Sequence, residues 1–135
     1  MKVAALTGDS GAGKTMLLVE LIRRFVSDGK RVGAIKHTHH ELNEEHRGDT
    51  ARFLDAGAEP VLLAAAGAAV IFRRNGTARA RYDGTRELLA HFATDVVLIE
   101  GFKDSRSWPS VTIVAHARPT VDDLMAELDV MWRRI

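Results

Sequence analysis

The chain contains no cysteine. This absence excludes disulfide bonds, a thiol nucleophile and any zinc site built from thiolates. It is compatible with a reducing cytoplasm, where we expect the protein to be. The chain also lacks a surplus of either charge, because 19 Lys and Arg residues face 18 Asp and Glu residues. No overall field therefore attracts nucleic acid or a membrane surface, and we expect neither as a partner.

A long hydrophobic run is missing as well. The longest apolar stretch, Pro60 to Phe72, is interrupted by Gly67 and falls short of the roughly 20 residues that cross a bilayer. The first apolar run stops at Gly8 and is too short for a signal peptide. Because 46% of the 135 residues are hydrophobic and 27% are charged, we expect one soluble globular domain over residues 1–135.

The order of apolar runs predicts alternating strands and helices. Val3 to Thr7 is a short apolar strand, and from Lys14 to Val26 apolar residues recur every three or four positions, as in a helix. A second strand, Arg31 to Lys36, follows that helix, so the two strands should be parallel. Further strands are expected over 61–65, 69–73, 96–99 and 111–115, and helices over 49–56, 85–93 and from Thr120, where a capping-box spacing begins.

A glycine-rich segment between the first strand and the first helix fits the pattern G-x-x-x-x-G-K-[ST] at every defined position: Gly8-Asp9-Ser10-Gly11-Ala12-Gly13-Lys14-Thr15. Glycines let consecutive N–H groups curl around a phosphate, and the helix amino terminus adds its positive end. Lys14 would neutralise the β- and γ-phosphates, and the Thr15 hydroxyl would ligate Mg²⁺. The sequence therefore predicts a phosphate loop that binds a nucleoside triphosphate with magnesium. The alternative is a plain glycine-rich turn before a helix.

Two acidic residues are candidates for the magnesium site. Glu100 ends the most β-branched strand of the chain, an arrangement that reaches Mg²⁺ from the strand beside a phosphate loop. The alternative is a solvent-facing strand end. Asp49 begins a helix, where it would either approach the metal or serve as the N-cap, and both roles are compatible. Asp95 opens the strand at its opposite end and is interpreted as a structural turn residue.

Histidines crowd the loop between His37 and Gly48, at His37, His39, His40 and His46. Such a cluster suggests a transition-metal site. The loop also leaves the carboxyl end of a strand beside the phosphates, where imidazoles suit an anion equally well. We favour a structural or phosphate-side role over a metal site.

Asn75-Gly76 indicates a two-residue hairpin turn, which needs positive φ at both central positions. The sequence thus predicts an α/β fold of the P-loop NTPase type, in which helices flank both faces of a mainly parallel sheet and an antiparallel hairpin is added over Val70 to Tyr82. In this hairpin the apolar strand 69–72 lies beside a strand that alternates Ala and Arg. The hairpin leaves an exposed edge of the sheet, which a second copy of the chain would cover. We therefore expect a homodimer; the alternative is a hairpin folded back on its own sheet.

The residues leave the base and the reaction open. The guanine signature N-K-x-D is absent, and Phe102-Lys103-Asp104-Ser105 does not replace it. No general base stands out. Three functions remain: a slow triphosphatase that acts as an accessory switch, a small-molecule kinase whose acceptor binds near the 37–47 loop, and a nucleotide-gated binding module without meaningful turnover.

Four segments together resemble the molybdopterin-guanine dinucleotide biosynthesis protein B family, MobB: the phosphate loop, Ile35-Lys36-His37, Asp49-Thr50 with Ala56-Gly57-Ala58, and Glu100-Gly101-Phe102-Lys103. The resemblance extends to about Ala115. It implies a GTP-binding, weakly GTP-hydrolysing homodimer that uses Mg²⁺ and assists a MobA-type enzyme in joining GMP to molybdopterin. GTP over ATP rests on the resemblance alone, and molybdopterin itself is an additional candidate partner.

The resemblance also implies roles for individual residues. It places phosphate and magnesium at Gly11, Gly13, Lys14 and Thr15, the metal-side carboxylates at Asp49 and Glu100, and the edge of the nucleotide at Lys36, His37 and Lys103. Lys14, Asp49 and Glu100 are then the catalytic candidates. The chain departs from the family pattern at Met16, which keeps only its backbone N–H as a phosphate ligand, at Gly48, where a lysine is usual, and in a short 115–120 segment.

Overall fold

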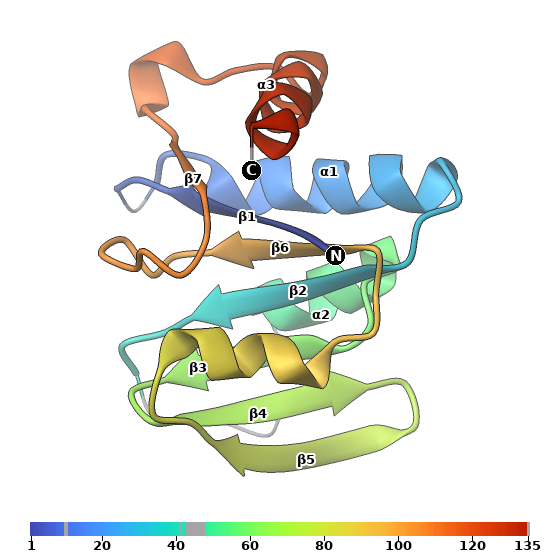
Figure 1. Ribbon diagram of the computed structural model, residues 1–135, viewed down its shortest axis with the longest axis vertical. Coiled ribbons are helices and arrows are strands. Elements are labelled where there is room, and N and C mark those ends of the chain that lie inside the picture. Colours follow the sequence, from blue (N-terminus) through green and yellow to red (C-terminus); the bar gives the residue numbers. More distant parts are fainter. Residues whose placement is uncertain (10, 41, 43–47, 135) are drawn as a thin grey trace.

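The computed structural model describes residues 1–9, 11–40, 42 and 48–134. Seven strands form one sheet in the order β5-β4-β3-β2-β6-β1-β7 (Figure 1). The strands are β1 (Lys2–Thr7), β2 (Val32–His37), β3 (Val61–Ala65), β4 (Ala68–Arg73), β5 (Gly76–Arg81), β6 (Val96–Glu100) and β7 (Ser110–Thr112). The helices are α1 (Lys14–Ser27), α2 (Gly48–Ala56), α3 (Val121–Arg133) and the short 3₁₀ helices η1 (Thr85–His91) and η2 (Ala115–Ala117).

The parallel part of the sheet confirms the predicted crossover topology. β1 is parallel to β6 and β7, and β2 is parallel to β6 and β3. β6 lies between β1 and β2, and all five of its residues are buried, as expected of a strand covered on both faces. The carboxyl ends of β1, β2 and β6 therefore meet at one edge of the sheet.

None of the helices in the described residues is long and apolar enough to span a bilayer.

Two apolar clusters cover the two faces of the sheet. Helices α1, α2 and α3 pack on one face, with fully buried side chains such as Leu18, Phe53 and Leu128. The other face is covered by η1 and by the segment after β6, through Leu88, Phe102 and Trp108. In Figure 1, η1 crosses in front of the sheet and α2 lies behind it. Helical cover on both faces is thus present, although one side has only η1.

The helix predicted over 85–93 is present as a 3₁₀ helix and ends two residues earlier than expected. The segment forms a seven-residue 3₁₀ helix that ends at His91, and Phe92 is extended, with φ −113° and ψ 135°. A Cβ built at Gly33 would lie 2.2 Å from Cδ1 of Phe92. The Phe92 ring therefore occupies the space beside Gly33, and its extended backbone stops the helix there.

The hairpin turn is displaced by one residue from its predicted position. Arg73 pairs with Gly76, so Arg74 and Asn75 are the central residues of the turn, and Asn75 does not have positive φ. The Arg74 N–H donates to Glu59 Oε2 at 2.7 Å, which anchors the turn at Arg74. β4 is also antiparallel to β3, so the hairpin extends the sheet as a three-stranded meander. The strand expected over 111–115 is shorter and begins earlier, as β7.

Replacing Gly33 with Ala is expected to destabilise the fold by about 1–3 kcal/mol, because the new methyl group meets the Phe92 ring. Urea unfolding measures this loss. In a Phe92→Ala background the same change should cost much less, which a double-mutant cycle detects. Gly84→Ala is the matched control, since nothing lies within 4 Å of a Cβ there. Equal costs in both backgrounds would contradict the contact.

Candidate functional site

The loop between β1 and α1 has the backbone that the phosphate-loop pattern requires. Gly8, Gly11 and Gly13 have φ values of 137°, 84° and 87°, a region that favours glycine. A Cβ at Gly8 would lie 2.3 Å from the Ile113 carbonyl oxygen, and one at Gly13 would lie 2.4 Å from Nη1 of Arg118. The N-cap of α1 is Gly13, and no side-chain cap hydrogen bond is present there among the described residues. The N–H groups at this helix end are therefore open to an anion.

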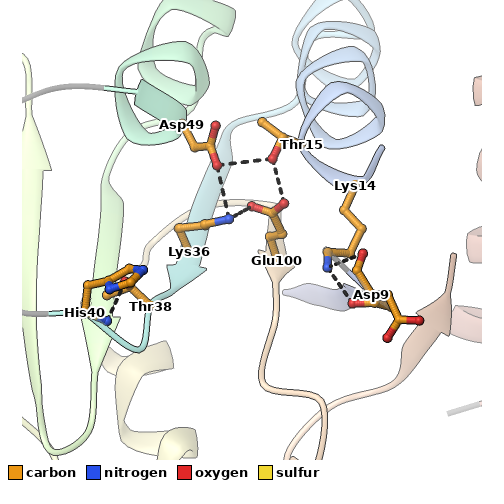
Figure 2. A network of polar contacts seen from close by, with 9 residues as sticks. Asp9, Lys14, Thr15, Lys36, Thr38, His40, Asp49 and Glu100 are labelled. Carbon is orange, nitrogen blue, oxygen red and sulfur yellow. Dashed lines mark hydrogen bonds and ion pairs between the residues drawn. The ribbon is translucent and has the colours of Figure 1, made fainter. Parts of the chain in front are cut away.

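Lys14 folds back along this loop. Its Nζ donates to the carbonyl oxygens of Gly8 at 2.6 Å and Asp9 at 3.3 Å (Figure 2). The Lys14 ammonium is thus held at the loop by carbonyl oxygens, and it forms no ion pair with a carboxylate of the described residues. The Asp9 carboxylate lies instead 3.6 Å from Nζ of Lys103, and both side chains are exposed. Ser10, the remaining loop candidate, lies outside the described residues.

Three oxygen-bearing side chains converge next to the loop, from α1, α2 and β6. The Thr15 hydroxyl lies 2.7 Å from Glu100 Oε1 and 3.2 Å from Asp49 Oδ2 (Figure 2). Hard oxygen ligands of this kind fit Mg²⁺, which usually keeps several waters and takes phosphate oxygens as well. The donor set therefore fits the metal that the sequence predicts. Asp49 is the second residue of α2, so it lies within the first turn and is not the N-cap.

Lys36 lies between these two carboxylates. Its Nζ is 2.6 Å from Glu100 Oε2 and 3.1 Å from Asp49 Oδ2. Glu100 is only 3% exposed, against 25% for the Lys36 side chain and 32% for that of Asp49. Burial alone would lower the pKa of Lys36, but the hydrogen bonds and charges of Glu100 and then Asp49 outweigh it and raise the pKa above its ordinary value. Lys36 is therefore the positive partner of a buried negative charge.

Aromatic side chains lie beside these polar groups, at the ends of β2 and β6. His37 stacks on Phe102 with ring centroids 4.2 Å apart, and Phe102 meets Trp108 edge-on at 5.5 Å. Phe102 has φ 56°, the one positive value at a non-glycine position among the described residues. A Cβ at Gly101 would lie 2.8 Å from Cβ of His37. The glycine thus allows the turn after β6 to approach the end of β2.

The glycine loop, Thr15, Asp49, Glu100, Lys36, His37 and Phe102 line one open cleft of about 1000 Å³. Most of the predicted site residues line it: Gly8, Gly11, Gly13, Lys14, Thr15, Met16, Lys36, His37, Asp49, Glu100 and Lys103. Ala12, within the loop, is buried. Asp95 lies at the other end of β6, where Oδ2 accepts a hydrogen bond of 2.8 Å from the Arg31 N–H, in agreement with its interpretation as a structural turn residue.

The histidine cluster separates in space. His37 and His39 line the cleft and meet edge-on at 4.7 Å, whereas His40 is exposed and donates its backbone N–H to Thr38 Oγ1. His46 lies outside the described residues. Over the described ranges no three His, Asp or Glu side chains are grouped closely enough to hold a metal ion. A metal in this cleft therefore needs the Thr15 hydroxyl together with phosphate or water oxygens.

The sequence analysis missed a group of hydroxyls in the cleft. Thr85 Oγ1 lies 2.7 Å from Ser107 Oγ and 3.2 Å from Ser105 Oγ, and all three residues line the cleft with Arg106. Arg106 makes no ion pair within the part of the chain that the structure describes. No motif signals this group, because Thr85 reaches the serines only through the packing of η1 on the sheet.

His37 is expected to titrate below its ordinary pKa of 6.5, because burial lowers the pKa and the charges of His39 and Lys36 act in the same direction. The unfolded chain then binds a proton more readily, so this contribution to stability is present above about pH 6.5 and is lost as pH falls through the folded pKa. An NMR titration measures the midpoint, and His39→Asn should raise it. A midpoint at or above 6.5 would contradict the burial argument.

Comparisons with known proteins identify the family to which the chain is similar. The family model described as "Molybdopterin guanine dinucleotide synthesis protein B" matches residues 3–130. The chain is 34% identical over 125 residues to the molybdopterin-guanine dinucleotide biosynthesis adapter protein of Haemophilus influenzae, covering 92% of this chain and 67% of that one. It is 31% identical over 121 residues to a probable adapter protein of the same name in Bacillus subtilis, covering 84% and 65%.

A solved structure resembles the fold. The crystal structure of a MobB protein homolog from Bacillus stearothermophilus superposes with a TM-score of 0.53 at 19% identity, covering 96% of this chain and 99% of that one. At this identity the likeness concerns the fold alone. The chain spans about two thirds of the length of the two curated relatives. Because the family model matches nearly the whole chain, the chain belongs to the molybdopterin-guanine dinucleotide synthesis protein B (MobB) family.

Proposed function

We propose that this protein is a cytoplasmic GTP-binding adapter in the biosynthesis of molybdopterin-guanine dinucleotide, with slow magnesium-dependent hydrolysis. The observation that carries the nucleotide part is the convergence of Thr15, Asp49 and Glu100 beside an uncapped helix amino terminus and its glycine loop. The pathway is inferred from the relatives, which are named adapter proteins. A MobA-type guanylyltransferase is the proposed partner, and molybdopterin is a candidate ligand of the assembly.

The chain's own groups account for triphosphate binding. The loop N–H groups and the start of α1 would surround the β-phosphate. Lys14, whose ammonium donates to the carbonyl oxygens of Gly8 and Asp9, would exchange these for phosphate oxygens. Thr15, Asp49 and Glu100 would hold Mg²⁺, which would supply positive charge to neutralise the phosphates. GTP is preferred to ATP in this proposal because of the family relation alone.

Slow hydrolysis follows from how the titratable groups are engaged. Asp49 and Glu100 each contact both Thr15 and Lys36, and His37 stacks on Phe102. The carboxylates of Asp49 and Glu100, which are the catalytic candidates, are thus engaged by Thr15 and Lys36 instead of being held against a water molecule. A protein that holds the triphosphate without consuming it quickly suits an adapter.

The cluster of three hydroxyls at Thr85, Ser105 and Ser107 favours a second candidate function, the transfer of a phosphoryl group to a small acceptor. These hydroxyls and Arg106 line the same cleft as Lys14, so an acceptor bound there would share a cavity with the γ-phosphate. The two functions differ in turnover. An adapter releases phosphate below roughly 1 s⁻¹ whether or not an acceptor is added, whereas a kinase depends on the acceptor.

We also propose a homodimer, in which the edge strand β5 is the contact. Among the described strands β5 is the end of the sheet and pairs with β4 alone, and five of its six residues are exposed, so a second copy could pair with its outer side. Ile71 is not part of this edge, because it lies on β4 and is 7% exposed within its own sheet. Light scattering at high micromolar concentration should give twice 14.8 kDa, with slowed amide exchange in β5. A monomeric mass would contradict the dimer.

Lys14→Ala is expected to weaken Mg-GTP binding at least tenfold, because a charge-assisted contact to phosphate contributes about 1.5–3 kcal/mol. Titration calorimetry measures the loss, and competition between GTP and ATP on the unmodified protein tests the base. The fold should survive, since Lys14 contacts only carbonyls of the loop. Lys30→Ala, an exposed lysine beyond the far end of α1, is the control. Unchanged affinity in a folded Lys14 variant would sink the assignment.

A further inference from the structure

We propose that the Lys36 ammonium and a divalent cation compete for one position between Asp49 and Glu100. Loading the metal with its nucleotide would then release Lys36 into the cleft as a second phosphate-binding lysine beside Lys14. The competition itself stands on the contacts among Lys36, Asp49 and Glu100, and only the release to phosphate rests on the proposed function. Lys36 thereby gains a defined role as the internal counter-cation of the empty site.

The competition follows from shared atoms. Asp49 Oδ2 is 3.1 Å from Nζ of Lys36 and 3.2 Å from the Thr15 hydroxyl, and the two oxygens of Glu100 divide between the same two groups. Figure 2 shows the lysine and the hydroxyl reaching both carboxylates. A cation that takes oxygens from Thr15, Asp49 and Glu100 would lie against the ammonium. The metal ion and the Lys36 ammonium are both positive and would repel each other at contact, so one displaces the other.

The charge balance explains why the lysine is needed when the metal is absent. A buried carboxylate requires a positive partner, and Glu100 is 3% exposed. With Lys36 bound, the two carboxylates leave one net negative charge, whereas a divalent ion neutralises both. The empty site therefore depends on Lys36, and the loaded site does not.

The cleft offers the released side chain a place beside Lys14. Lys36 pairs with Glu100 in the register of β2 and β6, and its side chain lines the cleft together with Lys14 and Thr15. A triphosphate would bring negative charge to that space and accept the ammonium. Metal alone offers no such compensation. Metal and nucleotide should therefore bind cooperatively, with each improving the affinity for the other by the same factor.

The test measures Mn²⁺ binding to nucleotide-free protein by electron paramagnetic resonance. Lys36→Met keeps the apolar stem and removes the charge, so its Mn²⁺ affinity should exceed that of the unmodified protein at least tenfold. Lys36→Arg, which retains the charge, should stay weak. Lys30→Met is the control for net charge, because Lys30 is exposed and remote from both carboxylates.

Lys36→Met leaves Glu100 without its partner, so the variant is expected to be less stable. Circular dichroism with and without Mn²⁺ covers this case: a variant that folds only with the metal supports the competition. Lys36→Gln is the second variant, since its amide can donate to a carboxylate without adding charge. Equal Mn²⁺ affinity in the unmodified, Met and Gln proteins would overturn the proposal.

A second arm tests the release. The factor by which Mg²⁺ tightens binding of a non-hydrolysable GTP analogue should shrink at least fivefold in Lys36→Met, and an unchanged factor would overturn the release. Failure of the proposed function is distinguishable, because a protein that binds no triphosphate would still show the Mn²⁺ difference. Equal Mn²⁺ affinities with intact nucleotide binding would remove the competition and leave the proposed function standing.

Discussion

The carboxylate of Glu100 is buried at the end of a fully buried strand, and the cost of that charge organises the surrounding structure. It is met by Lys36 from β2 and by Thr15 from α1. Asp49 from α2 joins through the same two partners. One charge thus fixes the relative positions of three elements around the end of β6. The phosphate loop lies where these elements meet, because Thr15 is both the last residue of the loop motif and a residue of the first turn of α1.

The local signals in the sequence were sufficient for the elements that determine their own conformation. The glycine loop has positive φ at Gly8, Gly11 and Gly13, as its pattern requires. The capping box at Thr120 is present, with the Asp123 N–H donating to the Thr120 hydroxyl at 3.1 Å. Continuous apolar runs located the central strands, because a strand buried on both faces has few alternatives.

The features that sequence reasoning missed depend on partners distant in the chain. The turn after β4 shifted because Glu59 holds the Arg74 N–H, and the 85–93 segment became a 3₁₀ helix where Phe92 fills the space beside Gly33. The position of Lys36 between Asp49 and Glu100 also required the sheet order, which places β2 directly against β6. The motifs and the family resemblance identified Lys36, Asp49 and Glu100 but did not predict the contacts among them.

The close approach of Gly101 to His37 bears on how related chains are recognised. Ile35-Lys36-His37 and Glu100-Gly101-Phe102-Lys103 lie on adjacent strands, and they are joined by the Lys36–Glu100 ion pair, the His37–Phe102 stack and a gap that admits only a glycine. The two short motifs are therefore halves of one three-dimensional signature. A search for related chains should therefore score the two motifs together, because each contributes one side of the same contact.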